Sequence, residues 1–389
     1  MGNNLAVDPI CVGVIGAGDI STVYLNTIRR TEALQLRGIA SRSMTSAQEK
    51  AAQYGVPAAT LDTLLGDPTV ELLVNLTPGS EHDAINARII EAGKHLYTEK
   101  PFSLSAANAR RLAGDAQAAG LRIGSAPDTF FGAGHQAARR VIDSGGIGKP
   151  VLGISIVGHA GVENFHPNPA GFYQSGGEPP FDIGPYYITQ WVNLLGPVRH
   201  VQASSAKGEN ERTVLRGPNA GSRFSVEIDT SYTAVLTFDE ATVSFVMSLD
   251  MAQPPTYQNL CYGTGGSLAL VDPNFFGGEP SLRQSGRDTQ SVSIDDLPFG
   301  MPNRKNHAGA PAADYRGVGL LDLAIGLRTG RRHRADAAFV VHVCEVMEAV
   351  VMSARTHETV TIESACHRPA PLDQDRDALL IAAMRSPWP

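Results

Sequence analysis

Short apolar runs alternate with longer amphipathic segments through the first third of the chain. The runs are rich in Val, Ile and Leu, which is typical of buried strands in a parallel sheet. The segments between them carry apolar residues three or four positions apart, which predicts helices. The pattern predicts strands at 11–16, 36–41, 70–78, 94–100 and 121–126, and helices at 17–30, 45–55, 80–93 and 105–120. Strands that alternate with helices of this length favour a parallel sheet with right-handed crossovers.

Beyond residue 150 the pattern changes to strand-like segments separated by turn residues. These segments lie at 150–159, 200–208, 225–239, 241–251, 259–273 and 291–295. The stretch "KGENERTVLRGPNAGSRF", residues 207–224, predicts an exposed loop or a hairpin extension.

Length and composition describe an ordinary globular chain. At 389 residues two domains are expected, and we place them at 1–128 and 129–389. A formal charge of −7 argues against nucleic acid or an anionic membrane as partner. No apolar run approaches the roughly 20 residues that span a bilayer, and the start lacks the layout of an export signal. The four cysteines are far apart, so we expect neither a disulfide framework nor structural zinc, and a cytoplasmic location.

The segment "GAGDIS" follows the first predicted strand and opens the first predicted helix. Gly16 and Gly18 would allow a tight turn and let a pyrophosphate approach the backbone N–H groups at the helix N-terminus, beside Asp19 and Ile20. Because the motif stands within a complete strand–helix unit, it indicates a dinucleotide site and not a simple glycine turn.

The second predicted strand ends in "IASRS", where a dinucleotide fold often carries an acid for the ribose 2′-hydroxyl. Here Ser41 stands in that place, with Arg42 beside it. An arginine fork next to hydroxyl groups suits a 2′-phosphate. The sequence therefore favours NADP as the cofactor, with NAD as the alternative.

Several motifs together resemble one family. They are Gly16 and Gly18, "NLTPGSEH" (75–82), Glu99-Lys100-Pro101, "GGEPPFDIGPYYI" (176–188) and the segment 330–354. In this order they are similar to the glucose–fructose oxidoreductase/inositol dehydrogenase (Gfo/Idh/MocA) family. The resemblance implies an α/β N-terminal Rossmann domain and an α+β C-terminal domain with a large, open, mainly antiparallel sheet. It also implies a nicotinamide-dependent oxidoreductase of sugars, polyols or cyclitols, assembled as a homodimer or homotetramer.

The resemblance also suggests site residues. Lys100, Asp182 and Tyr186 are the expected catalytic residues and, with His166, the expected substrate contacts. The remaining cofactor contacts are expected from residues at the ends of the third and fourth strands: Asn75, Thr77, Pro78, His82, Glu99 and Lys100. The peptide bond between Lys100 and Pro101 is expected to be cis.

Two roles are open for Lys100. As a base near neutral pH it would need its pKa lowered by about 3 units from about 10.4, which corresponds to about 4 kcal/mol. As an ammonium it would stabilise an alkoxide by its charge. Tyr186 stands where most sugar dehydrogenases of the family have histidine, so a phenol replaces the imidazole as the candidate proton-transfer group. Asp182 is expected to orient a substrate hydroxyl or to hold the lysine.

Two other functions remain open. A redox-neutral enzyme could retain its nicotinamide and oxidise a sugar transiently, to allow elimination or glycoside cleavage. A non-catalytic protein could bind dinucleotide and report redox state, although such a sensor has no need for Lys100 with Asp182. No pair of histidines has metal-ligand spacing backed by carboxylates, so no metal is expected.

Overall fold

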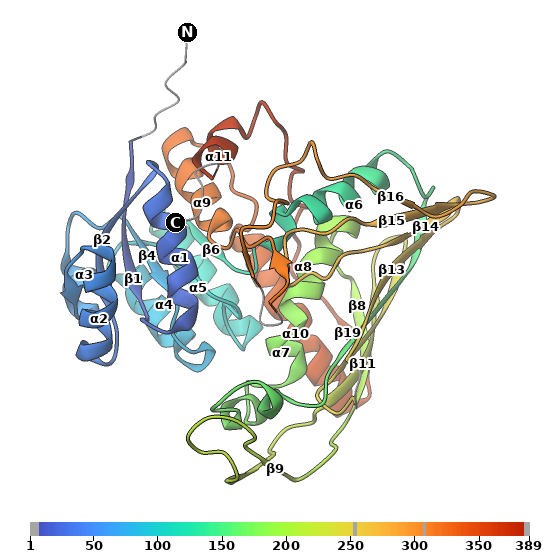
Figure 1. Cartoon of the computed structure of the whole chain (residues 1–389), viewed down its shortest axis with the longest axis horizontal. Helices are drawn as coiled ribbons and strands as arrows, with labels where there is room; N and C mark the ends of the chain where they lie inside the picture. Colours follow the sequence, from blue (N-terminus) through green and yellow to red (C-terminus); the bar gives the residue numbers. More distant parts are fainter. Residues whose placement is uncertain (1–7, 252–254, 306–308, 385–389) are drawn as a thin grey trace.

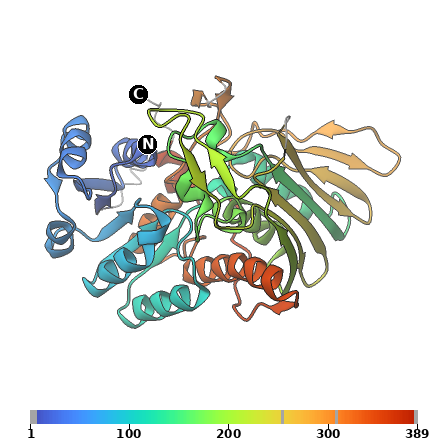
Figure 2. The same ribbon diagram turned by 90° about the horizontal axis from the view of Figure 1, so that it is seen from below.

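A computed structural model describes residues 8–251, 255–305 and 309–384 of the chain. Two sheets organise it, one in the blue and cyan part of the ribbon and one at the opposite side, with helices between them (Figures 1 and 2). The boundary predicted at residue 128 stays a prediction, because helices from the end of the chain return to the first sheet.

The first sheet is parallel and has the strand order β3-β2-β1-β4-β5-β6. This is the order of a Rossmann fold. Its strands are β1 (Ile10–Ile15), β2 (Leu34–Ala40), β3 (Ala58–Ala59), β4 (Leu72–Asn75), β5 (His95–Thr98) and β6 (Ile123–Ser125). Its helices are α1 (Asp19–Arg30), α2 (Met44–Tyr54), α3 (Leu61–Gly66), α4 (His82–Glu91) and α5 (Ala106–Ala118), with the 3-10 turn η1 (Gly79–Glu81) before α4. The predicted parallel sheet is confirmed; β3 and α3 were missed because both are too short to show a period.

The second sheet has nine strands in the order β16-β15-β14-β13-β7-β12-β11-β8-β19. Neighbouring strands are antiparallel except β7 and β12, which are parallel, so the sheet is mixed. Its strands are β7 (Pro150–Gly158), β8 (His200–Ala206), β11 (Ser231–Thr237), β12 (Thr242–Ser248), β13 (Thr256–Gly263), β14 (Gly266–Ala269), β15 (Ser281–Gln284), β16 (Gln290–Ser291) and β19 (Val360–Thr361). The expected large open sheet is therefore confirmed.

Helices cover one face of this sheet and leave the other open (Figure 1). The covering helices are α6 (Ala133–Asp143), α7 (Pro179–Asp182), α8 (Gly184–Leu195) and α10 (Ala337–Thr356), with the turns η2 (Thr129–Phe131), η3 (Val162–Asn164) and η4 (Ala170–Tyr173). The hairpin expected within 207–224 is formed by β9 (Glu211–Thr213) and β10 (Arg223–Ser225). A second small hairpin joins β17 (Arg304–Lys305) and β18 (Pro311–Ala312).

Helices α9 (Val318–Thr329) and α11 (Ala378–Ala383) pack together, and α9 also contacts β6 (Figure 1). Among the described helices, α10 alone is long and apolar enough to cross a membrane. The sequence analysis expected no such segment, because Glu345 and Glu348 interrupt the apolar residues of this helix. However, 78% of its most apolar window is buried inside the fold, as in a core helix. All four cysteines are free, and the compartment stays a prediction.

Candidate active site

The ends of four parallel strands meet at one edge of the first sheet. Ile15 of β1 pairs with Ala40 of β2 and Asn75 of β4, and Asn75 pairs with Thr98 of β5. The residues that follow these strand ends therefore lie side by side, at the edge where α/β sheets bind ligands. They include most of the cofactor contacts expected from the sequence: Gly16, Gly18, Asp19, Ile20, Ser41, Arg42, Thr77, Pro78 and Glu99.

Gly16 and Gly18 serve different purposes at this edge. Gly16 has φ +109°, and a Cβ there would lie 2.6 Å from the carbonyl oxygen of Leu76, so only glycine fits. Gly18 precedes α1, and a Cβ there would meet no protein atom within 4 Å. No side chain caps the helix, so its first N–H groups face that space. The residues present thus fit a bound pyrophosphate, and the cofactor contact at Gly16 and Gly18 stays a prediction.

Ser41 and Arg42 immediately follow β2. Ser41 is half-buried and Arg42 is exposed, with no ion pair or hydrogen bond to other described residues. The neighbouring hydroxyl of Ser43 is already used, because it accepts the N–H of Ser46 and caps α2. Ser41 and Arg42 therefore remain available to a ligand beside the N-terminus of α2.

Two expected cofactor contacts are instead engaged inside the protein. Asn75 is fully buried, and its side-chain oxygen accepts both the N–H and the hydroxyl of Thr77, which shapes the turn after β4. His82 is also fully buried, and its ring nitrogens contact the carbonyl oxygens of Thr77 and Pro101. We therefore assign both side chains a structural role: Asn75 shapes the turn after β4, and His82 joins that turn to the segment that carries Lys100.

Lys100 and Asp182 meet across the junction of the two sheets. Nζ of Lys100 donates to the carboxylate of Asp182 at 2.7 Å and to its backbone carbonyl at 2.9 Å. The side chains are 18% and 29% exposed, so the ion pair lies at the edge of the cleft and not in bulk solvent. The Lys100–Pro101 bond is cis, as the sequence predicted.

Glu99 fixes the backbone at this point. One carboxylate oxygen accepts the hydroxyl of Tyr24 on α1 at 2.7 Å, and the other accepts the N–H of Lys100 at 2.8 Å. Tyr24 is completely buried, and sequence reasoning missed this contact because only the helical spacing of Tyr24 on α1 marks it as inward-facing. Glu99 thus connects the dinucleotide-binding helix to the lysine.

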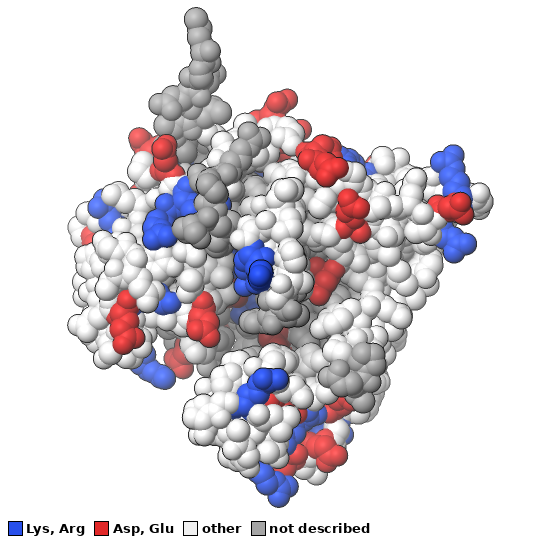
Figure 3. Space-filling model, in the orientation of Figure 1, with Lys and Arg blue, Asp and Glu red and all other residues white. Residues whose placement is uncertain are grey.

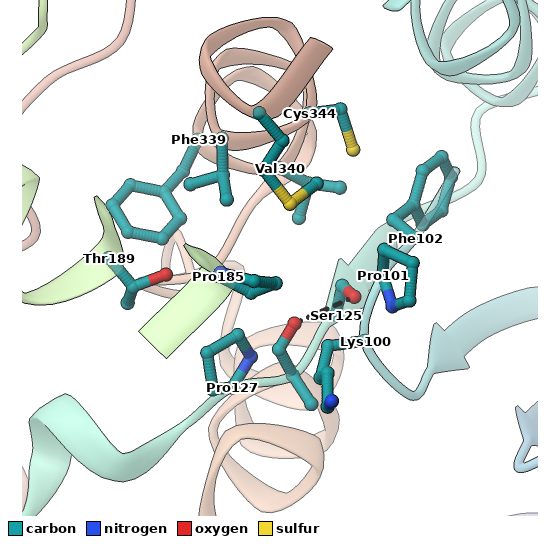
Figure 4. A pocket seen from close by; sticks show the side chains of 13 residues that line it. Lys100, Pro101, Phe102, Ser125, Pro127, Pro185, Thr189, Phe339, Val340 and Cys344 are labelled. Atoms are coloured by element: carbon teal, nitrogen blue, oxygen red, sulfur yellow. Dashed lines mark hydrogen bonds between the residues drawn. The ribbon is translucent and has the colours of Figure 1, made fainter. Parts of the chain in front are cut away.

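The stem of Lys100 packs beside an apolar cavity (Figure 4). Pro101, Pro127 and Pro185 line this cavity with side chains from α10, and the amine points away from the α10 residues. The cavity volume is about 10 Å³, about the space that one water molecule needs, so the wall behind the lysine is nearly filled. The wall shields the lysine from water on that side.

Electrostatics determines the charge of Lys100 in this structure. Burial lowers the pKa of its amine, but the charge of Asp182, followed by Tyr186 and Glu99, more than offsets burial and raises the pKa above its ordinary value. A base near neutral pH would require the opposite shift. The site therefore holds Lys100 as an ammonium.

Tyr186 lies on α8, one helical turn beyond Asp182. Nζ of Lys100 is 5.3 Å from the centroid of its ring, within the range of a cation–π contact. The buried guanidinium of Arg316 is close enough to Tyr186 for the two to interact electrostatically. Sequence reasoning missed Arg316, because it lies far along the chain in the segment before α9 and belongs to no motif.

His166 and His159 each accept a hydrogen bond from a backbone N–H two residues further along the chain. His166, expected at the substrate, makes local contacts: its Nδ1 accepts the N–H of Asn168, and its ring packs on Phe172. His159, at the end of β7, lies close enough to Asp182 to sense its charge. Burial lowers the pKa of His159, and its Nδ1 accepts the N–H of Gly161, which leaves Nε2 to carry the proton.

The molecular surface is hollowed between the first-sheet domain and the lobe that carries β9, and positive and negative side chains are interspersed on this face (Figure 3). In the described part of the chain no group of three or more His, Cys, Asp or Glu side chains could hold a metal ion.

A Rossmann sheet joined to a second domain that supplies an acid and a phenol beside a lysine is the arrangement of a dinucleotide-dependent oxidoreductase. The chain belongs to the GFO/IDH/MocA oxidoreductase family: residues 10–126 match its NAD-binding Rossmann-fold model, and residues 135–269 match a GFO/IDH/MocA C-terminal domain.

Individual relatives agree with this assignment. The trans-1,2-dihydrobenzene-1,2-diol dehydrogenase of Bos taurus is 26% identical over 267 residues, which cover 67% of this chain and 74% of the relative. The dTDP-3,4-didehydro-2,6-dideoxy-alpha-D-glucose 3-reductase of Actinomadura kijaniata is 28% identical over 272 residues, 66% of this chain and 80% of the relative. A crystal structure of levoglucosan dehydrogenase with NADH and levoglucosan is similar in fold, with a TM-score of 0.77, 17% identity, and coverage of 92% of this chain and 100% of that one.

Proposed function

We propose that this protein is an NAD(P)-dependent dehydrogenase or reductase that transfers a hydride to or from a carbon bearing an oxygen in a sugar, cyclitol or related polyol. The observation that carries the proposal is the contact of Lys100 with Asp182 and Tyr186 beside the dinucleotide edge. The sugar and diol substrates in the names of the relatives support this class of substrate.

Each side chain has a separate part in this reaction. The bound dinucleotide supplies or accepts the hydride. Lys100 has three N–H groups, of which two are donated to Asp182, so the third can bind the reacting oxygen and stabilise its negative charge. Tyr186 exchanges the proton with that oxygen. Asp182 keeps the lysine charged and directed.

NADP is the favoured cofactor within this proposal. Arg42 is exposed and Ser41 is accessible beside the N-terminus of α2, where no acid competes for the ribose. A 2′-phosphate there would gain a charge-assisted hydrogen bond and the favourable end of the helix dipole.

The open face of the second sheet is proposed to bind a second copy of this chain. Cross-strand pairs place Leu152 next to Tyr262, Ile154 next to Leu260, and Ile156 beside β12. The inward-facing neighbours on β7 are buried under helices, whereas Leu152 and Tyr262 are 38% and 37% exposed. A flat apolar stripe of this kind is typical of an interface. Sedimentation analysis should show a dimer or tetramer that Leu260→Asp dissociates, and a monomeric wild type would refute the proposal.

The function is tested with a panel of pyranoses, inositols, polyols and cyclic diols, each with NAD and NADP and, for their carbonyl forms, with NADH and NADPH. Change in nicotinamide absorbance is followed for the wild type and for Lys100→Met. The proposal expects turnover of at least one compound by the wild type and a loss of about 100-fold or more in the variant.

The outcomes separate the competing functions. Net nicotinamide turnover supports a dehydrogenase or reductase. Substrate consumption without net absorbance change indicates the redox-neutral enzyme. Tight dinucleotide binding without any chemistry, unchanged by Lys100→Met, would indicate a sensor and refute the proposal.

A further inference from the structure

A second, larger cavity lies between helices α5 and α10, which are side by side (Figure 2). Its volume is about 680 Å³, within the range of small-molecule sites. Residues around the start of β6 and the segment that leads into α10 complete its lining. Because β6 is parallel to its neighbour, its start lies at the edge of the sheet opposite the dinucleotide edge. The proposed reaction uses none of the residues that line this cavity.

Small and apolar side chains form the body of the cavity. Helix α5 contributes Ala113 and Ala116, and α10 contributes Ala337, Ala338 and Val341. Alanine methyl groups are short, so they leave room between the two helices. Ala337 and Ala338 are half-buried, so a molecule from solvent can reach this wall. The cavity therefore suits the apolar body of a ligand.

Three arginines line the same cavity, and they differ in what balances their charge. Arg110 lies 3.3 Å from the carboxylate of Glu345, and Arg332 pairs with Asp336. In the part of the chain that the structure describes, Arg122 forms no ion pair; its guanidinium contacts only backbone carbonyl groups. The lining thus carries one positive charge that is not paired with an acid of the protein.

Backbone groups hold Arg122 in place without cancelling its charge. Nη1 donates to the carbonyl oxygen of Arg331 at 2.6 Å, and Nη2 donates to that of Gly330 at 3.3 Å. The backbone N–H of Arg122 donates to Nδ1 of His95 at 3.0 Å. A guanidinium has five N–H groups, so about three remain for a ligand. A planar fork of this kind suits a carboxylate, which it can bind through two parallel hydrogen bonds.

We propose that this cavity binds a small organic acid, with its carboxylate at Arg122 and its apolar body between α5 and α10. An apolar wall next to an unpaired positive charge matches an amphipathic anion, because the head group and the body of such a molecule need these two surroundings. A cation with the same body would be repelled by Arg122, and a neutral molecule would gain nothing from its charge.

The new cavity is separate from the active site. Helix α10 lies between them: Val341 lines the new cavity, whereas Val340 lines the wall behind Lys100 (Figure 4). Strand β6 likewise has Ile123 at the new cavity and Ser125 at that wall. The two cavities share no lining residue, so an acid and a dinucleotide can be bound at the same time.

Isothermal titration calorimetry with three probes tests the head group and the apolar body separately. Octanoate has both features, acetate lacks the apolar body, and octylammonium has the same body with the opposite charge. We expect octanoate to bind at one site per chain, at least about 10-fold tighter than either other probe, with or without saturating NADH. Equal affinity for octylammonium, no octanoate binding, or an octanoate Kd that rises in proportion to NADH would overturn the inference.

A charge variant places the carboxylate. Arg122→Gln keeps N–H donors for the carbonyl groups but removes the charge, and it should weaken octanoate binding about 10-fold or more. The matched control is Arg111→Gln, since Arg111 is also on α5, is 52% exposed, pairs with Asp115 and does not line the cavity. It should leave the octanoate Kd within about twofold of wild type, and an equal loss in both variants would overturn the inference.

A filling variant covers the case in which Arg122→Gln does not fold. Ala338→Leu places a larger side chain in the cavity and should also weaken octanoate binding about 10-fold or more, whereas Ala118→Leu, on the exposed face of α5, should not. Octanoate binding that survives Ala338→Leu would overturn the inference. A change in the sedimentation of Ala338→Leu, with octanoate affinity unchanged, would show that the groove binds a second copy of the chain and would overturn it as well.

Discussion

Replacing Asp182 with asparagine should make the charge of Lys100 visible in the pH profile. Coulomb's law at the observed 2.7 Å gives about 1.5 kcal/mol with the dielectric constant of water and about 6 kcal/mol with an effective value of about 20. One pKa unit corresponds to about 1.4 kcal/mol, so loss of the carboxylate should lower the pKa of Lys100 by about 1 to 4 units. Burial, which already lowers this pKa, would then meet less opposition.

The direction in which kcat/KM changes with pH depends on which protonation state of Lys100 is active. The ammonium is the active form, and in the wild type it persists to high pH because its pKa is raised. In Asp182→Asn the ammonium is lost at lower pH, so kcat/KM should fall as pH rises above about 9, where the wild type keeps its lysine charged. Initial rates of nicotinamide turnover from about pH 6 to 11 measure this directly.

A matched control removes a carboxylate that has no contact with the site. Asp143 on α6 pairs with Arg139 at 2.6 Å, and Asp143→Asn should reproduce the wild-type profile. If Asp182→Asn lowered activity by the same factor at every pH, Asp182 would not control the protonation of Lys100, and the reasoning would be wrong.

Three further predictions concern the first-sheet domain. Gly16→Ala should lower the melting temperature in thermal melts, since its Cβ would meet the Leu76 carbonyl. Gly18→Ala should fold normally but raise the Kd for dinucleotide about 10-fold or more in a fluorescence titration. Arg42→Ala should raise the Kd for NADPH about 10- to 100-fold and that for NADH less than about twofold; equal effects would refute the NADP preference. Burial raises the pKa of Asp128 to about 6, so the folded state binds an extra proton between about pH 4 and 6. As pH rises to about 7, the wild type should therefore lose about 3 kcal/mol of unfolding free energy relative to Asp128→Asn. Urea melts measure this, and parallel stability curves for the two proteins would contradict it.

The sequence was most informative where the physics is local. Apolar runs bounded by turn residues predicted the parallel sheet, and a glycine pair at a strand end predicted the tight turn at Gly16 and the open space beside Gly18. The contact between Lys100 and Asp182 followed from two motifs whose order matched a family.

What the sequence could not show depends on contacts between distant segments. Arg316 interacts electrostatically with Tyr186 from a distant segment of the chain, and no local pattern encodes that approach. The raised pKa of Lys100 depends on the short distance to Asp182, whose charge outweighs the effect of burial, and that distance is not a property of "TEKP". His82 looked like a ligand in its motif, whereas its complete burial shows that it joins two turns.

The central claim is that the ammonium of Lys100 binds the oxygen at the carbon that exchanges hydride. A single-turnover measurement tests it most directly: enzyme loaded with dinucleotide is mixed with substrate, and the rate constant of hydride transfer is compared between the wild type and Lys100→Met. The account predicts a fall of about 100- to 1,000-fold with the dinucleotide Kd within about threefold of wild type. Hydride transfer within about twofold of the wild-type rate would contradict it.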